Sequence, residues 1–298
     1  MGIVFALLSM LCFAGNIFII RAAMSRMSVN IGFPVVLTIN VAFAALVFGF
    51  ERLRMDTPFL FHWKAAGWFA LSGVVGIYLG RRMLLDAVHI LGPARASVLH
   101  TASPIVTLVA AWFLVGERLG LYEFLLMGLV IAGLLATQLQ NARSPRAQIG
   151  DRAAFRQAMV LSLLTVVGFG VGNAIRGVAI REWNEAALGA VLASGAALLC
   201  QLATGSGPGA IFEGLRKGEH KAIGLYAASG VATVSGTIFS AMAMQRIEIA
   251  IATVVTYTTP LVVFPVSAIL YKNSEGLSVR TVAGAAMVLL GIALLAFR

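Results

Sequence analysis

Ionisable side chains inside apolar segments are the residues of this sequence that could do chemistry. Asp86 lies in an apolar run, with Arg81 and Arg82 shortly before it. An ionisable group at the centre of a membrane helix costs about 2.5–3.5 kcal/mol on insertion scales, so each one needs a reason. Arg82 and Asp86 are four residues apart and can pair on one helix face. Arg81 projects about 100° away, and its planar guanidinium suits a carboxylate ligand, with headgroup contact as the alternative.

Two polar clusters stand directly before prolines, Pro104 and Pro260. A proline inside a helix removes one backbone hydrogen bond, which is tolerated where a cavity or a neighbouring side chain compensates. We therefore expect helix kinks at both prolines, with the polar clusters lining a substrate cavity. The alternative is that their hydroxyl groups only join neighbouring helices. The candidate substrate-binding residues of these clusters are His100, Thr101, Thr256 and Tyr257.

Proton coupling and further ligand contacts have their own candidates. Histidine titrates near neutral pH, and Asp86 is an acidic residue inside an expected span, so His100 or Asp86 could carry a coupled proton. Asn16 and Asn173 lie inside apolar segments and could bind a ligand or each other. Arg176 ends an expected span, and we expect it to anchor at the membrane interface.

Motifs for catalysis, nucleotides and metals are missing from the sequence. It contains no HExxH, no GxSxG and no GxxxxGK[ST], which are typical of metalloproteases, serine hydrolases and P-loop nucleotide-binding proteins. We therefore expect no enzyme activity, no cofactor and no metal site. Any transport would be driven by gradients rather than by nucleotide hydrolysis.

Composition decides where the elements that carry these residues must lie. Of the 298 residues, 60% are hydrophobic and 11% are charged, whereas about a quarter of a soluble protein is charged. The apolar excess must face lipid. The net charge of +10 arises from cations between the apolar runs, so it indicates contact with anionic headgroups rather than with nucleic acid.

Apolar runs long enough to cross a bilayer divide the chain. A span needs about 20 residues, and this length predicts an all-α, multi-pass protein with ten transmembrane helices. The expected spans are 3–20, 32–50, 65–88, 93–115, 122–139, 157–176, 186–204, 222–244, 249–271 and 280–297. The organisation is then a five-helix unit at 1–140, a basic connecting loop at 141–156, and a second five-helix unit at 157–298.

The two units resemble each other when Pro104 is aligned with Pro260. In both, a polar cluster precedes the proline, and an apolar run, a short charged loop and a helix rich in Gly and Ala follow it. Five spans is an odd number, so the two units are inserted in opposite orientations. This inverted repeat is typical of secondary transporters, whose binding site lies near the midplane between the repeats.

Glycines at helical spacing predict where helices approach one another closely. Gly76 and Gly80 are four residues apart in the third span, and Gly168, Gly170 and Gly172 follow one another in the sixth. Small residues at such spacing allow tight helix packing in membranes. We expect packing, rather than ligand binding, at these positions.

Three stretches of the first unit resemble a known family. They read LGPARAS at 91–97, SP at 103–104 and GERL at 116–119, and together they are similar to the EamA-type transporters of the drug/metabolite transporter superfamily. In the second unit, Tyr271–Glu275 replaces the GER loop. In the first span of the first unit, Ala14 stands where the family usually has Trp. The resemblance implies a ten-helix transporter of amino acids, metabolites or drugs with both termini in the cytoplasm. The Lys and Arg residues lean slightly towards the opposite orientation.

The sequence as a whole favours a transporter of a small organic metabolite that carries a carboxylate. We expect it to be an exporter in a bacterial plasma membrane. Arg81 and Arg82 are its expected anion contacts. An alternative is proton-coupled efflux of lipophilic cations at Asp86, and a different class of protein is a membrane scaffold or receptor. The expected partners are the solute, membrane lipid and a coupling ion or proton, with monomer and dimer both open.

Overall fold

The computed structural model of the protein describes residues 1–54, 58–84, 102–141, 152–205, 209, 216, 218–263, 266 and 279–296. Within these ranges every regular element is a helix. The helices of the first half are α1 (Gly2–Met24), α2 (Val29–Arg54), α3 (Trp63–Ser72), η1 (Gly73–Gly80), α6 (Ser103–Val115) and α7 (Leu121–Asn141). Those of the second half are α8 (Arg152–Glu182), α9 (Ala186–Thr204), α11 (His220–Met244), α12 (Ile249–Thr256) and α14 (Val279–Ala296).

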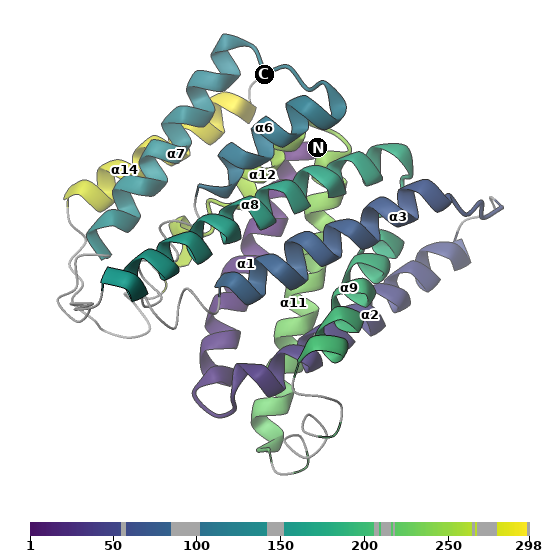
Figure 1. The fold of residues 1–298 in the computed structure, drawn as a ribbon. Coiled ribbons are helices and arrows are strands. Elements are labelled where there is room, and N and C mark those ends of the chain that lie inside the picture. Colours follow the sequence, from purple (N-terminus) through teal and green to yellow (C-terminus); the bar gives the residue numbers. More distant parts are fainter. Residues whose placement is uncertain are drawn as a thin grey trace.

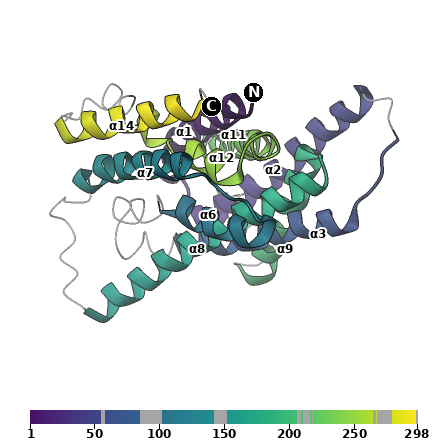
Figure 2. The same ribbon diagram turned by 90° about the horizontal axis from the view of Figure 1, so that it is seen from above.

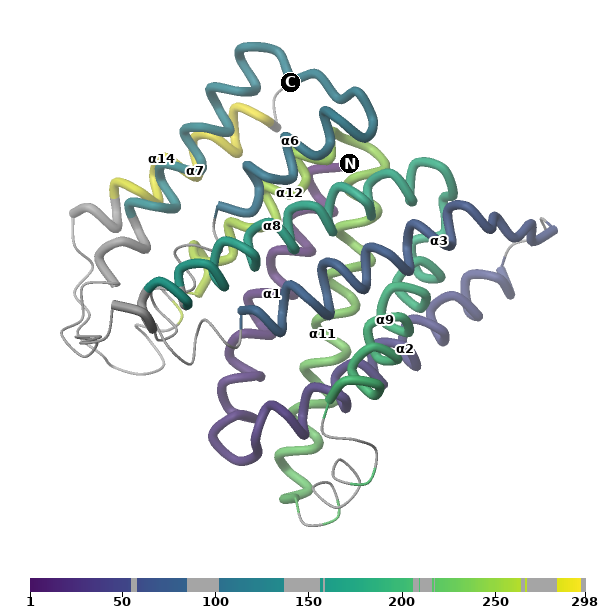
Figure 3. Tube along the Cα trace, viewed as in Figure 1, coloured from purple at the N-terminus to yellow at the C-terminus, as the bar shows by residue number. Residues whose placement is uncertain are grey.

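The helix α3 continues without a turn into the π-helical segment η1, and the two form one rod (Figure 3). The eleven elements of the described ranges therefore make ten rods, which confirms the all-α fold and the ten expected segments. Among the residues that the structure describes, five helices are long and apolar enough to cross a membrane: α1, α2, Met159–Glu182 of α8, α9 and α11. Shorter apolar helices are Ser103–Val115, Leu121–Ala136, Ile249–Val263 and Ala283–Leu295.

Two differences from the expected spans bear on the candidate site. The helix α8 continues to Glu182, six residues beyond the expected end at 176, because the apolar stretch Gly177–Ile180 extends the span. The helix α6 begins at Ser103, and residues 93–101 of the expected fourth span lie outside the described ranges. The first of these differences moves Arg176 from a helix end into a helix interior.

The outer surface of the helices is apolar. Leu46 on α2, Phe113 on α6 and Leu121 on α7 are each more than 70% exposed. Large exposed apolar side chains of this kind suit lipid and not water. The chain is therefore an integral, multi-pass membrane protein.

Helix contacts follow a twofold pattern that exchanges the two halves. The helix α1 packs against α11, and α8 packs in the same way against α3 and η1. The helix α1 also contacts α12, as α8 contacts α6, while α2 pairs with its counterpart α9 and α7 with its counterpart α14. The most extensive contacts thus join the two halves, so neither half forms a separate bundle.

Seen from above, the helices lie in two layers that each mix both halves (Figure 2). One layer holds α14, α12, α1 and α11, and the other holds their counterparts α7, α6, α8 and α3. The helix α1 begins on the side where α14 ends (Figure 1), and Met1 and Leu295 line the same pocket there. We call this side of the molecule the terminus side.

Glycines allow α8 and the η1 rod to touch at their backbones. A Cβ atom added to Gly172 would lie 2.6 Å from the Cα atom of Gly76, and one added to Gly168 would lie 3.1 Å from the Cα atom of Gly80. Real Cβ atoms do not approach a backbone so closely without displacing it. The tight packing expected from this glycine spacing is confirmed. It fixes the position of α8, which carries Asn173 and Arg176.

Candidate functional site

The ninth span is interrupted near its middle. The helix α12 ends at Thr256, a turn occupies Tyr257–Thr259, and helix resumes at Pro260. Pro104 likewise stands in the first turn of α6, directly after Ser103. A proline there has no hydrogen-bond partner to lose, because the first N–H groups of a helix are unpaired in any case. Both prolines therefore lie where a helix starts.

Arg176 is the buried cation of this region. It lies on α8, six residues and about 9 Å before the end of the helix, and only 8% of it is exposed. The expectation that Arg176 anchors at the interface is wrong, because α8 is longer than the expected span. Its Nε–H group is buried with no hydrogen-bond partner, and no carboxylate pairs with it among the residues that the structure describes.

Polar side chains from α6, from α8 and from the break in the ninth span surround Arg176. Its Nη1 group donates to Oδ1 of Asn173 at 3.2 Å, and Nδ2 of Asn173 donates to the hydroxyl of Tyr257 at 3.4 Å. The fully buried Ser103, at the start of α6, also lies beside the Tyr257 hydroxyl. We call Ser103, Asn173, Arg176 and Tyr257 the Arg176 cluster. It joins α6, α8 and the break in the ninth span.

The cluster presents donors in excess of acceptors. A buried guanidinium with an unpaired N–H group carries an uncompensated charge, and proteins rarely bury such a charge without a partner. A carboxylate accepts two hydrogen bonds from a guanidinium in a matching planar geometry. The Arg176 cluster is therefore chemically suited to an anionic oxygen ligand.

The threonines around the break mostly bond within the protein. Thr258 donates to the carbonyl of Val255 at 2.6 Å and lies 3.1 Å from Sδ of Met10 on α1. Thr259 donates to the carbonyl of Thr256 at 3.0 Å. The hydroxyl of Thr256 is buried and has no partner in the described part of the chain, so it remains a candidate ligand contact.

Arg81 and Arg82 lie apart from the Arg176 cluster. The Arg81 guanidinium stands over the ring of Phe33 at 5.2 Å. Arg82 donates to the Tyr78 hydroxyl at 3.0 Å and to Oγ1 of Thr204 at 3.3 Å, so it joins η1 to α9. Gly80 next to them packs against Gly168, about two turns of α8 away from Arg176. The structure thus does not bring the predicted arginines together with Asn173 and Tyr257.

Asn16 and Asn173 occupy matching places in the two halves but have different partners. Oδ1 of Asn16 accepts from the Ser229 hydroxyl of α11 at 2.6 Å, which joins α1 to α11. Asn173 instead bonds Arg176 and Tyr257, so the bond between the two asparagines, one of the two alternatives for them, is not formed. Asn16 is buried in a helix contact, and Asn173 belongs to the Arg176 cluster.

Three predicted site residues lie outside the described ranges. These are Asp86, His100 and Thr101. Their predicted roles, and the pairing of Arg82 with Asp86, stay predictions. Among the residues that the structure describes, no group of His, Cys, Asp and Glu side chains could hold a metal ion.

A second polar group lies on the terminus side around Glu117. Gly116 ends α6 with a left-handed backbone (φ 64°), and this turn directs the chain inward. The Glu117 side chain is 3% exposed, and its Oε1 atom accepts from Nη2 of Arg181 at 3.3 Å. The same oxygen accepts from the backbone N–H of Ile249 at 2.7 Å. Glu117 from the first half therefore caps the first turn of α12 from the second half.

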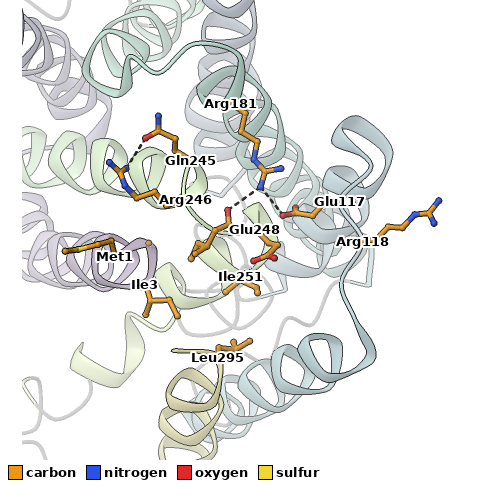
Figure 4. A pocket seen from close by; sticks show the side chains of 12 residues that line it. Met1, Ile3, Glu117, Arg118, Arg181, Gln245, Arg246, Glu248, Ile251 and Leu295 are labelled. Atoms are coloured by element: carbon orange, nitrogen blue, oxygen red, sulfur yellow. Dashed lines mark hydrogen bonds and ion pairs between the residues drawn. The ribbon is translucent and has the colours of Figure 1, made fainter. Parts of the chain in front are cut away.

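A pocket of about 750 Å³ opens beside this carboxylate (Figure 4). Its charged lining comprises Glu117, Arg118, Arg181, Arg246, Glu248 and the N-terminal residue Met1. Arg118 points away from the pocket, whereas Arg181 points toward Glu117. Burial raises the pKa of the Glu117 carboxyl above its ordinary value, although Arg181 and the backbone N–H groups of α12 act in the opposite direction.

The raised pKa of Glu117 predicts the sign of a pH effect on stability. The folded state binds the Glu117 proton more tightly than the unfolded state, so its contribution is complete below the unfolded pKa. It is lost as pH rises through the folded pKa. We expect wild type to lose thermal stability relative to Glu117→Gln over this window, measured in detergent from about pH 4 upward. The control Glu182→Gln keeps Glu117, so its stability should fall with pH as that of wild type does. A parallel pH profile for wild type and Glu117→Gln would contradict the prediction.

Comparison with known proteins agrees with the fold. The family model described as "EamA-like transporter family" matches residues 1–138 and again residues 156–297. A solved structure, described as the crystal structure of a protein, is 15% identical and superimposes with a TM-score of 0.75. The similarity covers 98% of this chain and 97% of that one, and at this identity it shows the fold alone. No curated protein matches the chain.

Proposed function

Since the chain belongs to the EamA-like transporter family, we propose that it is a secondary transporter that moves a small organic solute bearing a carboxylate by alternating access. The family match supports transport across a membrane as the general activity. The carboxylate, the site that binds it and the mechanism are the proposal.

One observation supports a carboxylate-bearing substrate: Arg176 is buried without an anionic partner among the residues that the structure describes. An arginine held in an apolar interior needs a partner, and Asn173 offers it only a neutral amide oxygen. A transported anion supplies the missing charge when it binds. The substrate carboxylate would then accept from the Nε–H group of Arg176, with the Tyr257 hydroxyl as a further donor.

The position of the cluster supports a site that both sides of the membrane can reach in turn. It lies where α6, α8 and the interrupted ninth span meet, and interrupted helices at a repeat interface are typical of transporter binding sites. The bond between Asn173 and Tyr257, at 3.4 Å, is long for a hydrogen bond. A ligand that replaces it loses little and gains charge-assisted bonds.

The direction and the compartment follow from resemblance. We propose export across a bacterial plasma membrane, because the motifs of the first half resemble those of EamA-type exporters. A proton or another ion would supply the driving force. The Arg176 cluster favours an anionic substrate over a lipophilic cation, since its charged member is a guanidinium.

Thermal stability of the purified protein in detergent tests this proposal. A ligand at about one hundred times its Kd stabilises the protein by about 2.7 kcal/mol. We expect organic acids or amino acids to raise the melting temperature, and lipophilic cations to leave it unchanged. Tyr257→Phe removes one donor and should weaken the response about tenfold. A panel in which only cations stabilise the protein would overturn the proposal in favour of cation efflux at Asp86.

A further inference from the structure

The helices α8 and α12 are tied together at two levels. At the Arg176 cluster, Asn173 of α8 bonds Tyr257, the residue that follows α12. At the terminus side, Glu117 bonds both Arg181 of α8 and the first N–H group of α12. Asn173 and Arg181 are eight residues apart, as are Ile249 and Tyr257, so the two ties are separated by about 12 Å on each helix.

Arg181 connects the tie at the terminus side, which we call the upper tie, to a third element. Its Nε group donates to the carbonyl of Met244 at the end of α11, and Nη2 donates to the carbonyl of Ile247 in the turn before α12. The upper tie thus holds the end of α8, the turn between α11 and α12, and the loop after α6. We call Glu117, Arg181 and the Ile249 N–H group the Glu117 latch.

The carboxylate of Glu117 is more buried than the carboxylates of the other ion pairs on the terminus side. Lys64 pairs with Glu182 at 2.7 Å, and Arg52 lies 3.8 Å from Glu185. These pairs also join the two halves, but the side chains of Glu182 and Glu185 are 27% and 16% exposed. Glu117 is 3% exposed, and its Oε2 atom is buried without a hydrogen-bond partner in the described structure. A buried, charge-assisted contact contributes more than a surface pair, which is worth little in water.

We propose that Glu117 is a positioning residue that closes the terminus side of the transporter and, through α12, places Tyr257 against Asn173 and Arg176. The proposal rests on the proposed function, because closing one side has a meaning only for a protein that alternates between two. Opening the terminus side separates α8 from α12, and this breaks the Glu117 latch. Water in the adjacent pocket then solvates the carboxylate, Arg181 and the freed N–H group.

The short helix α12 can transmit a movement from the Glu117 latch to the Arg176 cluster. With its first turn held by Glu117 and its last residue beside Tyr257, α12 moves as one rigid piece. A displacement of its first turn is therefore transmitted to the Arg176 cluster. Ligand binding at the cluster and opening at the terminus side become one coupled event, with Glu117 at one end and Tyr257 at the other.

Access to a buried reporter from each side tests the proposal without any substrate. Thr256 is 5% exposed at the end of α12 and beside the cluster, so Thr256→Cys reports access to the middle of the molecule. Cys12→Ser and Cys200→Ser remove the native thiols. A membrane-impermeant maleimide is applied to each face of sealed vesicles in turn, and a tag at the N-terminus identifies the terminus side.

Loss of the latch should change the two labelling rates in opposite directions. We expect Glu117→Gln to raise labelling from the terminus side about tenfold, the factor for one charge-assisted hydrogen bond, and to lower labelling from the other side. Arg181→Gln should do the same, and the double variant should add nothing further. The matched control Glu182→Gln removes an exposed carboxylate one residue from Arg181 and should leave both rates unchanged.

Two results would overturn the role of Glu117. Unchanged labelling would show that the latch does not hold the terminus side closed, and faster labelling from both sides would show a general loosening of the fold. If Glu117→Gln does not fold, the same labelling rates are measured on Arg181→Gln, which also removes the latch. A labelling shift without carboxylate binding would uphold the latch and refute the substrate class, so the two failures are distinguishable.

Discussion

Replacing Arg176 with methionine is expected to abolish carboxylate binding while leaving the unliganded protein as stable as wild type or more stable. Two charge-assisted hydrogen bonds contribute about 1.5–3 kcal/mol each, so affinity should fall at least about 100-fold. Methionine fills a similar volume without a charge. Replacing buried ionic groups with apolar ones is often neutral or stabilising by about 1–4 kcal/mol. Melting temperature with and without ligand measures both effects.

Loss of binding together with unchanged or raised stability distinguishes a ligand site from a structural ion pair. If Arg176 neutralised a carboxylate within the protein, its loss would leave that charge buried and cost about 3–5 kcal/mol. A strong loss of stability in Arg176→Met would therefore contradict the account, whatever happens to binding. Arg176→Lys serves as a control for charge, since lysine keeps the cation but lacks the planar fork that engages a carboxylate.

Gly73→Ala is expected to cost about 3 kcal/mol or more of stability. Gly73 stands at the junction of α3 and η1, and a Cβ atom there would overlap the backbone carbonyl of Ala193 on α9. Overpacking usually costs about 1–3 kcal/mol when side chains can shift, and here the obstacle is backbone. The midpoint of thermal unfolding in detergent should fall accordingly.

Gly67 provides a matched control in the same rod. It lies on α3, six residues before Gly73, and nothing is within 4 Å of its added Cβ atom. Gly67→Ala should therefore gain about 0.5–1 kcal/mol, because alanine favours the helix more than glycine does. Equal stability of the Gly67 and Gly73 variants would show that α9 does not approach the rod as closely as described.

The sequence could predict the fold because the bilayer imposes a simple length rule. Apolar runs of about 20 residues placed every described helix, and for α9 the expected span at 186–204 agrees with the helix Ala186–Thr204. Glycine spacing also identified η1 and α8 as segments that approach other helices closely, since only small residues permit such an approach, although it did not show that they approach each other. These signals are local, and each can be seen within a single segment.

The candidate site depended on features that are not local. Arg176 was assigned to the interface because the expected span ended there, although the apolar stretch Gly177–Ile180 after it indicates that the helix continues. Its neighbour Asn173 meets Tyr257 across 84 residues of sequence, and no spacing rule reports such a contact. The domain boundaries 1–140, 141–156 and 157–298 stay a prediction.

The burial of Glu117 could not be predicted from the composition of the loop in which it lies. A charged pair between two apolar runs is typical of an exposed connection, and Glu117–Arg118 has that appearance. The left-handed turn at Gly116 instead directs the glutamate inward, where the start of α12 and Arg181 receive it. A side chain with the sequence context of a surface charge is thus among the most buried acidic groups of the described chain.

Solute exchange in reconstituted vesicles tests the central claim most directly. Vesicles loaded with an unlabelled carboxylate that stabilises the protein are diluted into the same compound in labelled form, and counterflow is followed over time. The account predicts counterflow by wild type and by Glu182→Gln, and none above the empty-vesicle background by Arg176→Met. Counterflow by Arg176→Met at the wild-type rate would contradict it.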